Sequence, residues 1–212
     1  MRLLVPLAFA ALAAGCFPYS MGQTAATVPP GAPAFSVTAS AIPVTRDATG
    51  PSDIAALPQL DLVGRVGVGP RTDATVRAVG LGGSVAIKHQ LVGRDDYDDA
   101  VSVLADAGLL NGGIHGYVGG AVLVSGGDAN RIVPYGGLRA FQVVRLRDSD
   151  DVERGEGTSV GAFAGLRIGT LGLGVSPEIG VYADGSLAGL RDNTVVVVPS
   201  LTLHGRLTRI LR

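Results

Sequence analysis

Apolar and polar residues alternate along most of this chain with a period of two, the pattern of β-strands whose two faces differ in polarity. Near the C-terminus, Leu201, Leu203 and Leu207 alternate with polar residues such as His204 and Arg206. Short segments of this kind are separated by Gly, Asp, Asn and Pro, which are residues of turns. No long stretch has the 3.6-residue period of an amphipathic helix. The pattern therefore predicts an all-β protein.

The alternation predicts ten strands. In the ninth, Pro177 shares the apolar face, and because proline lacks the N–H that a ladder needs, we expect a bulge or an edge there. If 73–91 formed one bent strand, the count would fall to nine, and an eight-stranded barrel is also possible. The expected strands are 34–44, 57–68, 73–81, 83–91, 99–108, 114–125, 131–145, 158–168, 172–182 and 193–208.

The links between these strands alternate in length. The even-numbered links are short, whereas three of the five odd-numbered links, at 45–56, 146–157 and 183–192, are long. Short turns on one side, longer loops on the other and an even strand count are typical of outer-membrane barrels. We predict a closed antiparallel up-and-down transmembrane β-barrel of about ten strands over 34–212, with both chain ends on one side.

The N-terminus has the pattern of an export signal. Arg2 precedes an apolar run over 3–15 that is too short to span a membrane as a helix. Cys16 follows as the only cysteine, so it cannot form an internal disulfide. The run Leu12-Ala13-Ala14-Gly15-Cys16 resembles the cleavage and lipid-attachment site of bacterial lipoprotein signal peptides, which implies a cleaved signal over 1–15 and a lipid on Cys16. An ordinary signal peptide is the alternative.

Residues 17–33 are rich in Pro, Ala, Thr and Ser, a composition typical of a flexible linker. We therefore expect 16–33 to comprise the lipidated Cys16 and a flexible tether to the barrel. A lipid in the inner leaflet would place the N-terminus on the periplasmic side of the bacterial outer membrane. The expected partners are outer-membrane lipids and this N-terminal lipid anchor. The net charge of −1 gives no reason to expect a nucleic-acid partner.

The polar faces of the strands carry large charged residues between glycines. Such spacing suits a crowded interior, where long side chains need room and partners, so we expect apolar faces toward lipid and a polar lumen. A barrel of this size is mostly filled by side chains, which makes a wide pore implausible. The charges would stabilise the barrel through mutual hydrogen bonds, or alternatively form a basic lumen that favours anions. The expected lumen charge network is Asp61, Arg65, Arg77, Lys88, Arg139, Arg167 and Glu178.

Three short runs give the chain a family likeness. They are Tyr135-Gly136-Gly137-Leu138-Arg139, Gly165-Leu166-Arg167-Ile168-Gly169 and Pro177-Glu178-Ile179-Gly180-Val181-Tyr182. With these runs, residues 34–208 resemble small bacterial outer-membrane β-barrel proteins. The resemblance implies a lipid-anchored outer-membrane barrel with a structural or interaction role.

Two other functions stay open. Only ten residues are Phe or Tyr, too few for the usual aromatic girdles, which favours a soluble periplasm-facing β-barrel lipoprotein that binds an apolar ligand. An outer-membrane enzyme has less support, because His89, His115 and His204 lie on different predicted strands with no acid at a recognisable spacing. We expect no catalytic residue, no metal and no cofactor.

Overall fold

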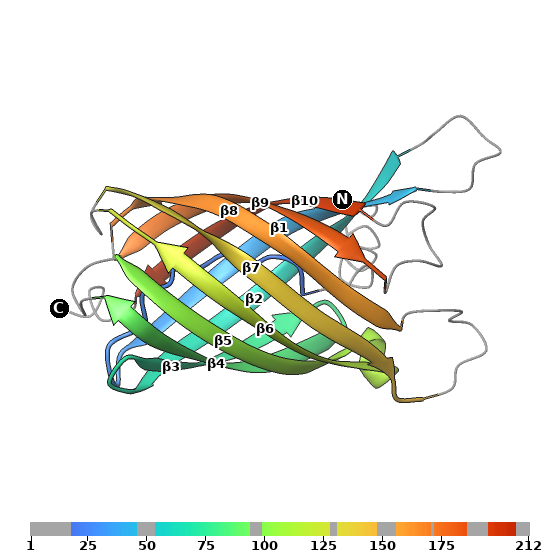
Figure 1. Ribbon diagram of the computed structural model, residues 1–212, viewed down its shortest axis with the longest axis horizontal. Helices are drawn as coiled ribbons and strands as arrows, with labels where there is room; N and C mark the ends of the chain where they lie inside the picture. Colours follow the sequence, from blue (N-terminus) through green and yellow to red (C-terminus); the bar gives the residue numbers. More distant parts are fainter. Residues whose placement is uncertain are drawn as a thin grey trace, which may run out of the picture.

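The computed structural model describes residues 18–45, 54–93, 99–127, 131–147, 156–170, 172–185 and 195–206. In these ranges, ten strands form a closed antiparallel barrel in which β1 pairs with β10 (Figure 1). No helix in these ranges is long and apolar enough to cross a bilayer. The elements are β1 (Pro33–Thr45), β2 (Ile54–Gly69), β3 (Thr72–Val79), β4 (Gly82–Gly93), β5 (Ala100–Leu110), η1 (Asn111–Gly113), β6 (His115–Ser125), β7 (Ile132–Arg145), β8 (Gly157–Gly169), β9 (Leu173–Asp184) and β10 (Val195–Arg206).

The predicted all-β fold and its ten strands are confirmed. The largest boundary difference is three residues, at the start of β2, which we expected at 57 and which begins at Ile54. A single bent strand over 73–91 is excluded, because the chain reverses at Gly80 and Leu81, where Gly80 has a φ of 48°. A positive φ is accessible to glycine at little cost, so the turn is encoded locally.

The bulge expected at Pro177 is absent from the ladder. The pairing of β9 with β10 continues through Pro177 and Leu201 without a shift of register. Toward β8, pairs form at Gly165–Glu178 and Ile168–Val175 with unchanged register, and the positions between them are unpaired. The missing proline N–H therefore removes ladder bonds without inserting a residue.

Apolar side chains point out of the barrel and polar side chains point in. Leu201 and Leu203 are 48% and 56% exposed, whereas Arg77 and Arg167 are only 9% and 6% exposed. A soluble barrel would show the opposite arrangement, with its leucines inside and its arginines in water. The predicted inversion of the two faces is confirmed.

The two ends of the barrel differ. One end, here called the long-link end, carries the connections at 46–53, 146–156 and 185–194. The opposite, short-turn end carries the turns after β2, β4, β6 and β8, as well as the start of β1 and the end of β10. Pro33 and Arg206 therefore lie at the same end, as an even strand number requires.

The lumen contains the chain's own N-terminal part. Residues 18–32, here called the luminal segment, run through the barrel from the long-link end to the short-turn end before β1 begins (Figure 1, blue). Tyr19 packs on Tyr182 near the end of β9, with ring centroids 5.0 Å apart, and Pro30 bridges to Gly67 near the end of β2. The small side chains that suggested a tether also suit a narrow lumen. The expectation of a flexible tether is therefore wrong for this segment.

The luminal segment also changes the position of the N-terminal part. Tyr19 lies at the long-link end, opposite to Arg206, so the expectation that both chain ends share one side holds for the barrel strands but not for residue 19. Residues 1–17, which include the predicted signal peptide and Cys16, lie outside the described residues.

Replacing Gly165 by alanine should destabilise the barrel. A Cβ at Gly165 would lie 2.6 Å from the Tyr135 ring and 2.8 Å from the carbonyl oxygen of Pro177. Such overpacking typically costs about 1–3 kcal/mol. Gly64 is the matched control, since its Cβ would meet nothing within 4 Å. Urea unfolding in detergent should show a lower midpoint for Gly165→Ala than for Gly64→Ala, and equal midpoints would contradict this packing.

Candidate functional site

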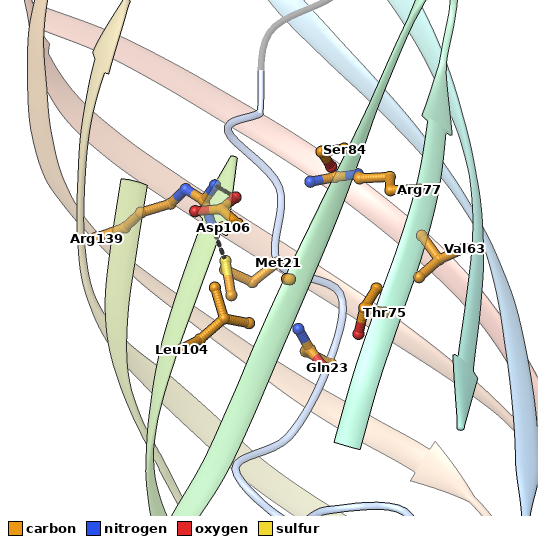
Figure 2. Close-up of a pocket in the computed structure, with 10 residues that line it drawn as sticks. Met21, Gln23, Val63, Thr75, Arg77, Ser84, Leu104, Asp106 and Arg139 are labelled. Carbon is orange, nitrogen blue, oxygen red and sulfur yellow. Dashed lines mark hydrogen bonds and ion pairs between the residues drawn. The ribbon is translucent and has the colours of Figure 1, made fainter. Parts of the chain in front are cut away.

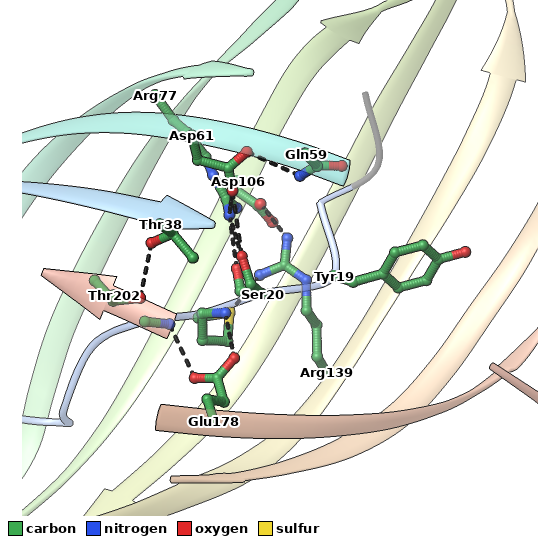
Figure 3. A network of polar contacts seen from close by, with 12 residues as sticks. Tyr19, Ser20, Thr38, Gln59, Asp61, Arg77, Asp106, Arg139, Glu178 and Thr202 are labelled. Carbon is green, nitrogen blue, oxygen red and sulfur yellow. Dashed lines mark hydrogen bonds and ion pairs between the residues drawn. The ribbon is translucent and has the colours of Figure 1, made fainter. Parts of the chain in front are cut away.

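Among the described residues, buried ion pairs join side chains from different strands on the inner face of the wall. One pair, Arg139 with Asp106, joins β7 to β5 across the intervening β6. Gly119 on β6 makes room for it, because a Cβ there would lie 2.7 Å from Oδ1 of Asp106. The pairs are Arg77–Asp61, Lys88–Asp73 (Nζ–Oδ2, 3.5 Å) and Arg139–Asp106 (Nη2–Oδ2, 2.5 Å), as Figure 3 shows for the first and third.

Glu178 binds the backbone of the luminal segment. Its two carboxylate oxygens accept hydrogen bonds from the N–H groups of Met21 and Gly22, at 2.8 and 2.9 Å (Figure 3). Glu178 is 6% exposed, and a carboxylate so deeply buried needs such partners. Two consecutive N–H groups on one carboxylate fix the position of the segment along the barrel axis.

Lys88 and Asp73 hold the middle of the segment. The ammonium group of Lys88 donates to the carbonyl oxygens of Thr24 and Ala26, at 3.1 and 2.8 Å. Asp73 accepts a hydrogen bond of 3.0 Å from the N–H of Val28. Both wall residues are fully buried, and a buried charge needs compensation. Their charges are compensated by each other and by the backbone dipoles of the segment.

Other wall residues bind further backbone groups of the luminal segment. Near the long-link end, the Tyr182 hydroxyl donates to the Tyr19 carbonyl at 2.5 Å, and Arg77 donates to the Ser20 carbonyl at 2.8 Å. Farther along the segment, Oγ of Ser125 accepts from the N–H of Ala25, and Oε1 of Gln90 accepts from the N–H of Thr27. The wall thus contacts the main chain of the segment over most of its length.

An aromatic cluster closes the long-link end of the lumen. The Tyr19 ring packs edge-on to Phe141, with centroids 5.5 Å apart, and lies 5.0 Å from the Tyr182 ring. Six of the seven aromatic residues that the structure describes are buried in the interior, and Phe35 alone faces outward. The scarcity of girdle aromatics therefore reflects their use as interior packing. The buried cluster is Tyr19, Ile42, Leu110, Tyr117, Phe141, Val143, Tyr182, Val196 and Val198.

A small cavity lies beside Met21, between the segment and the wall (Figure 2). Its volume of about 30 Å³ has room for one or two water molecules. Among the described residues, Oγ1 of Thr75 and Oδ1 of Asp106 are buried without a hydrogen-bond partner there, as is Nε of Arg139. These polar atoms suit buried water, and the cavity is too small for a conduit.

The sequence-predicted residues take different places in this arrangement. Arg77 and Asp61 meet each other, while Lys88, Arg77 and Glu178 contact the luminal segment. Arg65 donates to Gln23 at 3.0 Å, and Arg167 lines a polar cavity with it near the short-turn end.

Sequence reasoning missed Asp73, Asp106 and the luminal segment. Asp73 shares the interior face with Thr75 and Arg77, two and four residues later, so the alternation could have revealed it. The segment lacks such periodicity, and its partners recognise main-chain atoms that are common to every residue. Nothing in its composition therefore distinguished it from a linker.

The described histidines contact polar neighbours on the adjacent strand or in the preceding turn. His204 is 2.9 Å from Oγ of Ser176, and His115 is 3.3 Å from the side-chain amide of Asn111. No group of three or more His, Cys, Asp or Glu side chains suited to a metal occurs in the described ranges.

Comparisons with known proteins give only a likeness in fold. No family model matches the chain. No curated protein matches it either. Among solved structures, the N-terminal β-barrel domain of Pseudomonas aeruginosa OprF is 9% identical, with 84% of this chain and 99% of that chain covered and a TM-score of 0.34. The Yersinia pestis outer membrane protein Ail is 14% identical (84% and 99%, TM-score 0.39), and Neisserial surface protein A is 12% identical (82% and 95%, TM-score 0.38).

Replacing Arg139 by methionine should strongly destabilise the protein. Removing one partner of a buried ion pair leaves the other charge uncompensated, which costs about 3–5 kcal/mol. The double variant Arg139→Met with Asp106→Asn should recover part of this loss, because no unpaired carboxylate remains. A double-mutant cycle by urea unfolding measures the coupling. Strictly additive effects would show that the pair contributes nothing as a pair.

Proposed function

We propose that this protein is a sealed β-barrel of the bacterial outer membrane with a structural or interaction role. The proposal rests chiefly on the combination of an apolar outer surface with a lumen filled by polar side chains and the luminal segment. The outer surface suits acyl chains, and the filled lumen does not suit transport. Contacts with other molecules would then be made at the two ends of the barrel.

The outer surface supports insertion into a bilayer. Thirty large apolar side chains among the described residues are exposed on it. Soluble monomers rarely expose a contiguous apolar patch above a few hundred Å². Apart from β3, with eight residues, each strand has 11 or more, which meets the requirement of about 9–11 residues for a tilted spanning strand. The closed ladder leaves no unpaired edge, as a hydrocarbon environment demands.

The interior argues against the soluble alternative. A lipoprotein that binds an apolar ligand needs an apolar internal cavity, whereas the lumen here is lined by Asp61, Lys88 and Arg139, all buried. The luminal segment also occupies the space that a ligand would need. The same filling supports a structural role for the charges over passage of anions.

We further propose that Cys16 carries a lipid, because the sequence before it resembles a lipoprotein cleavage site. With the short turns on the periplasmic side, Tyr19 belongs to the outer end of the barrel. Three residues span at most about 11 Å, far less than the hydrocarbon core of about 30 Å. As long as the luminal segment fills the barrel, a lipid on Cys16 would therefore reach the outer leaflet. It would not reach the inner leaflet, which the sequence alone led us to expect.

An arginine on the outer surface should test membrane insertion. Leu201 lies near the middle of β10 and is 48% exposed, whereas Val195 begins the strand and is 52% exposed. In a bilayer, arginine costs about 2–4 kcal/mol at the midplane and about 0–1 kcal/mol near the interface. Leu201→Arg should therefore reduce the heat-modifiable folded band in lipid vesicles, and Val195→Arg should not. For a soluble barrel, neither change would matter.

Replacing Cys16 by alanine should abolish acylation and leave the barrel folded. The first described contacts of the segment with the wall begin at Tyr19, so the fold does not require the thioether. Metabolic labelling with a radioactive fatty acid reports the lipid, and migration before and after boiling reports the barrel. Label that persists in Cys16→Ala would exclude this residue as the anchor.

A further inference from the structure

The geometry points to a binding site for an extended polypeptide inside the barrel, which the chain's own luminal segment fills. The ligand class is a peptide strand that is recognised through its main chain. The site comprises the wall side chains that bond to residues 19–28, above all Glu178, Lys88, Asp73 and Arg77. The inference does not depend on membrane insertion.

The wall recognises the main chain of the segment almost residue by residue. Each residue from 19 to 28, apart from Gln23, has a backbone N–H or carbonyl that bonds to a wall side chain, and Gln23 is held through its own amide oxygen by Arg65 and Lys88. Backbone donors and acceptors are present in every peptide. If the segment only filled space, the wall side chains would not need to form hydrogen bonds with one main-chain group after another.

The charge of each wall group is opposite to the partial charge of the main-chain group that it contacts. Carboxylates meet N–H groups: Glu178 binds those of Met21 and Gly22, and Asp73 binds that of Val28. Cationic groups meet carbonyls, as Lys88 does at Thr24 and Ala26. Because N–H and carbonyl groups alternate in a fixed order along a chain, this distribution selects one register and one N-to-C direction.

Steric limits at two positions of the segment define which peptides fit. Gly22 has a φ of 57°, and a Cβ there would overlap Oγ1 of Thr202 and lie 3.0 Å from Oγ1 of Thr38. The side chain of Ala25 is fully buried. The site therefore takes a peptide with a left-handed glycine beside Glu178 and a small residue at the position of Ala25. An aromatic residue at the leading end completes the cluster around Phe141 and Tyr182.

The covalent link between the segment and the wall is a short exposed turn that leads into β1. Ala32 donates to the carbonyl of Pro29 at 3.0 Å, Gly31 donates to the carbonyl of Gly67 at 2.8 Å, and Pro29, Pro30 and Gly31 are exposed. The segment is thus a ligand that is covalently tied to the wall beside its site, which makes its binding intramolecular. A strand of the same pattern from a second copy of this chain could take its place once the tether is cut.

The test uses the full chain with a protease recognition sequence inserted between Pro30 and Gly31. The protein is folded in detergent, cleaved, unfolded, and refolded with a tenfold excess of a fluorescent peptide of residues 18–30. Labelled peptide should co-migrate with the folded, heat-modifiable barrel and displace most of the original segment. Uncleaved protein, treated in the same way, should take up little label.

Two modified peptides separate main-chain recognition from simple filling. N-methylation at Met21 removes a donor to Glu178 and should weaken uptake on the order of tenfold or more, since bonds to buried charges are among the strongest. N-methylation at Ala26, whose N–H bonds to none of the described residues, is the matched control and should weaken uptake much less. A folded barrel without label, equal effects of the two N-methyl groups, or failure of the cleaved pair to refold would overturn the proposal.

Discussion

Compensation of buried charge by main-chain dipoles is the interaction on which this structure depends. The wall strands use their own N–H and carbonyl groups in the ladder, so charged side chains that point inward need partners from elsewhere. The ion pair of Arg77 with Asp61 supplies part of this need. Glu178 and Lys88 find theirs on the luminal segment. Without the segment, Glu178 and Lys88 would lose these main-chain partners, and a buried charge without partners carries a large desolvation cost.

The same arrangement explains the composition of the chain. Aromatic side chains fill the interior around the segment, and glycines on the wall make room for them. Gly161 and Gly180 both lie against the Tyr182 ring, where a Cβ would overlap it. The segment supplies small residues in return, so the cross-section stays within the limits of a ten-stranded barrel. Large side chains on the wall and small side chains on the luminal segment therefore fill the interior together.

The sequence was sufficient for the strands and for their two faces, because a period of two with strong polarity contrast is a local signal. It was insufficient for the partners of individual charges. Arg139 meets Asp106 across an intervening strand, which depends on the register of three strands and on Gly119 between them. The bulge predicted at Pro177 did not form, since neighbouring ladders kept their register. The luminal segment gave no signal, because its residues are recognised through atoms that all residues share.

The path of the luminal segment also constrains the order of assembly. A chain cannot easily enter a ring that has already closed, and β1 follows the segment after a turn of only a few residues. β1 pairs with β10 from Ala34–Arg206 to Ser40–Ser200. This pairing must therefore form around a luminal segment that is already in position. The luminal segment thus acts as an internal template for the closing contact between β1 and β10.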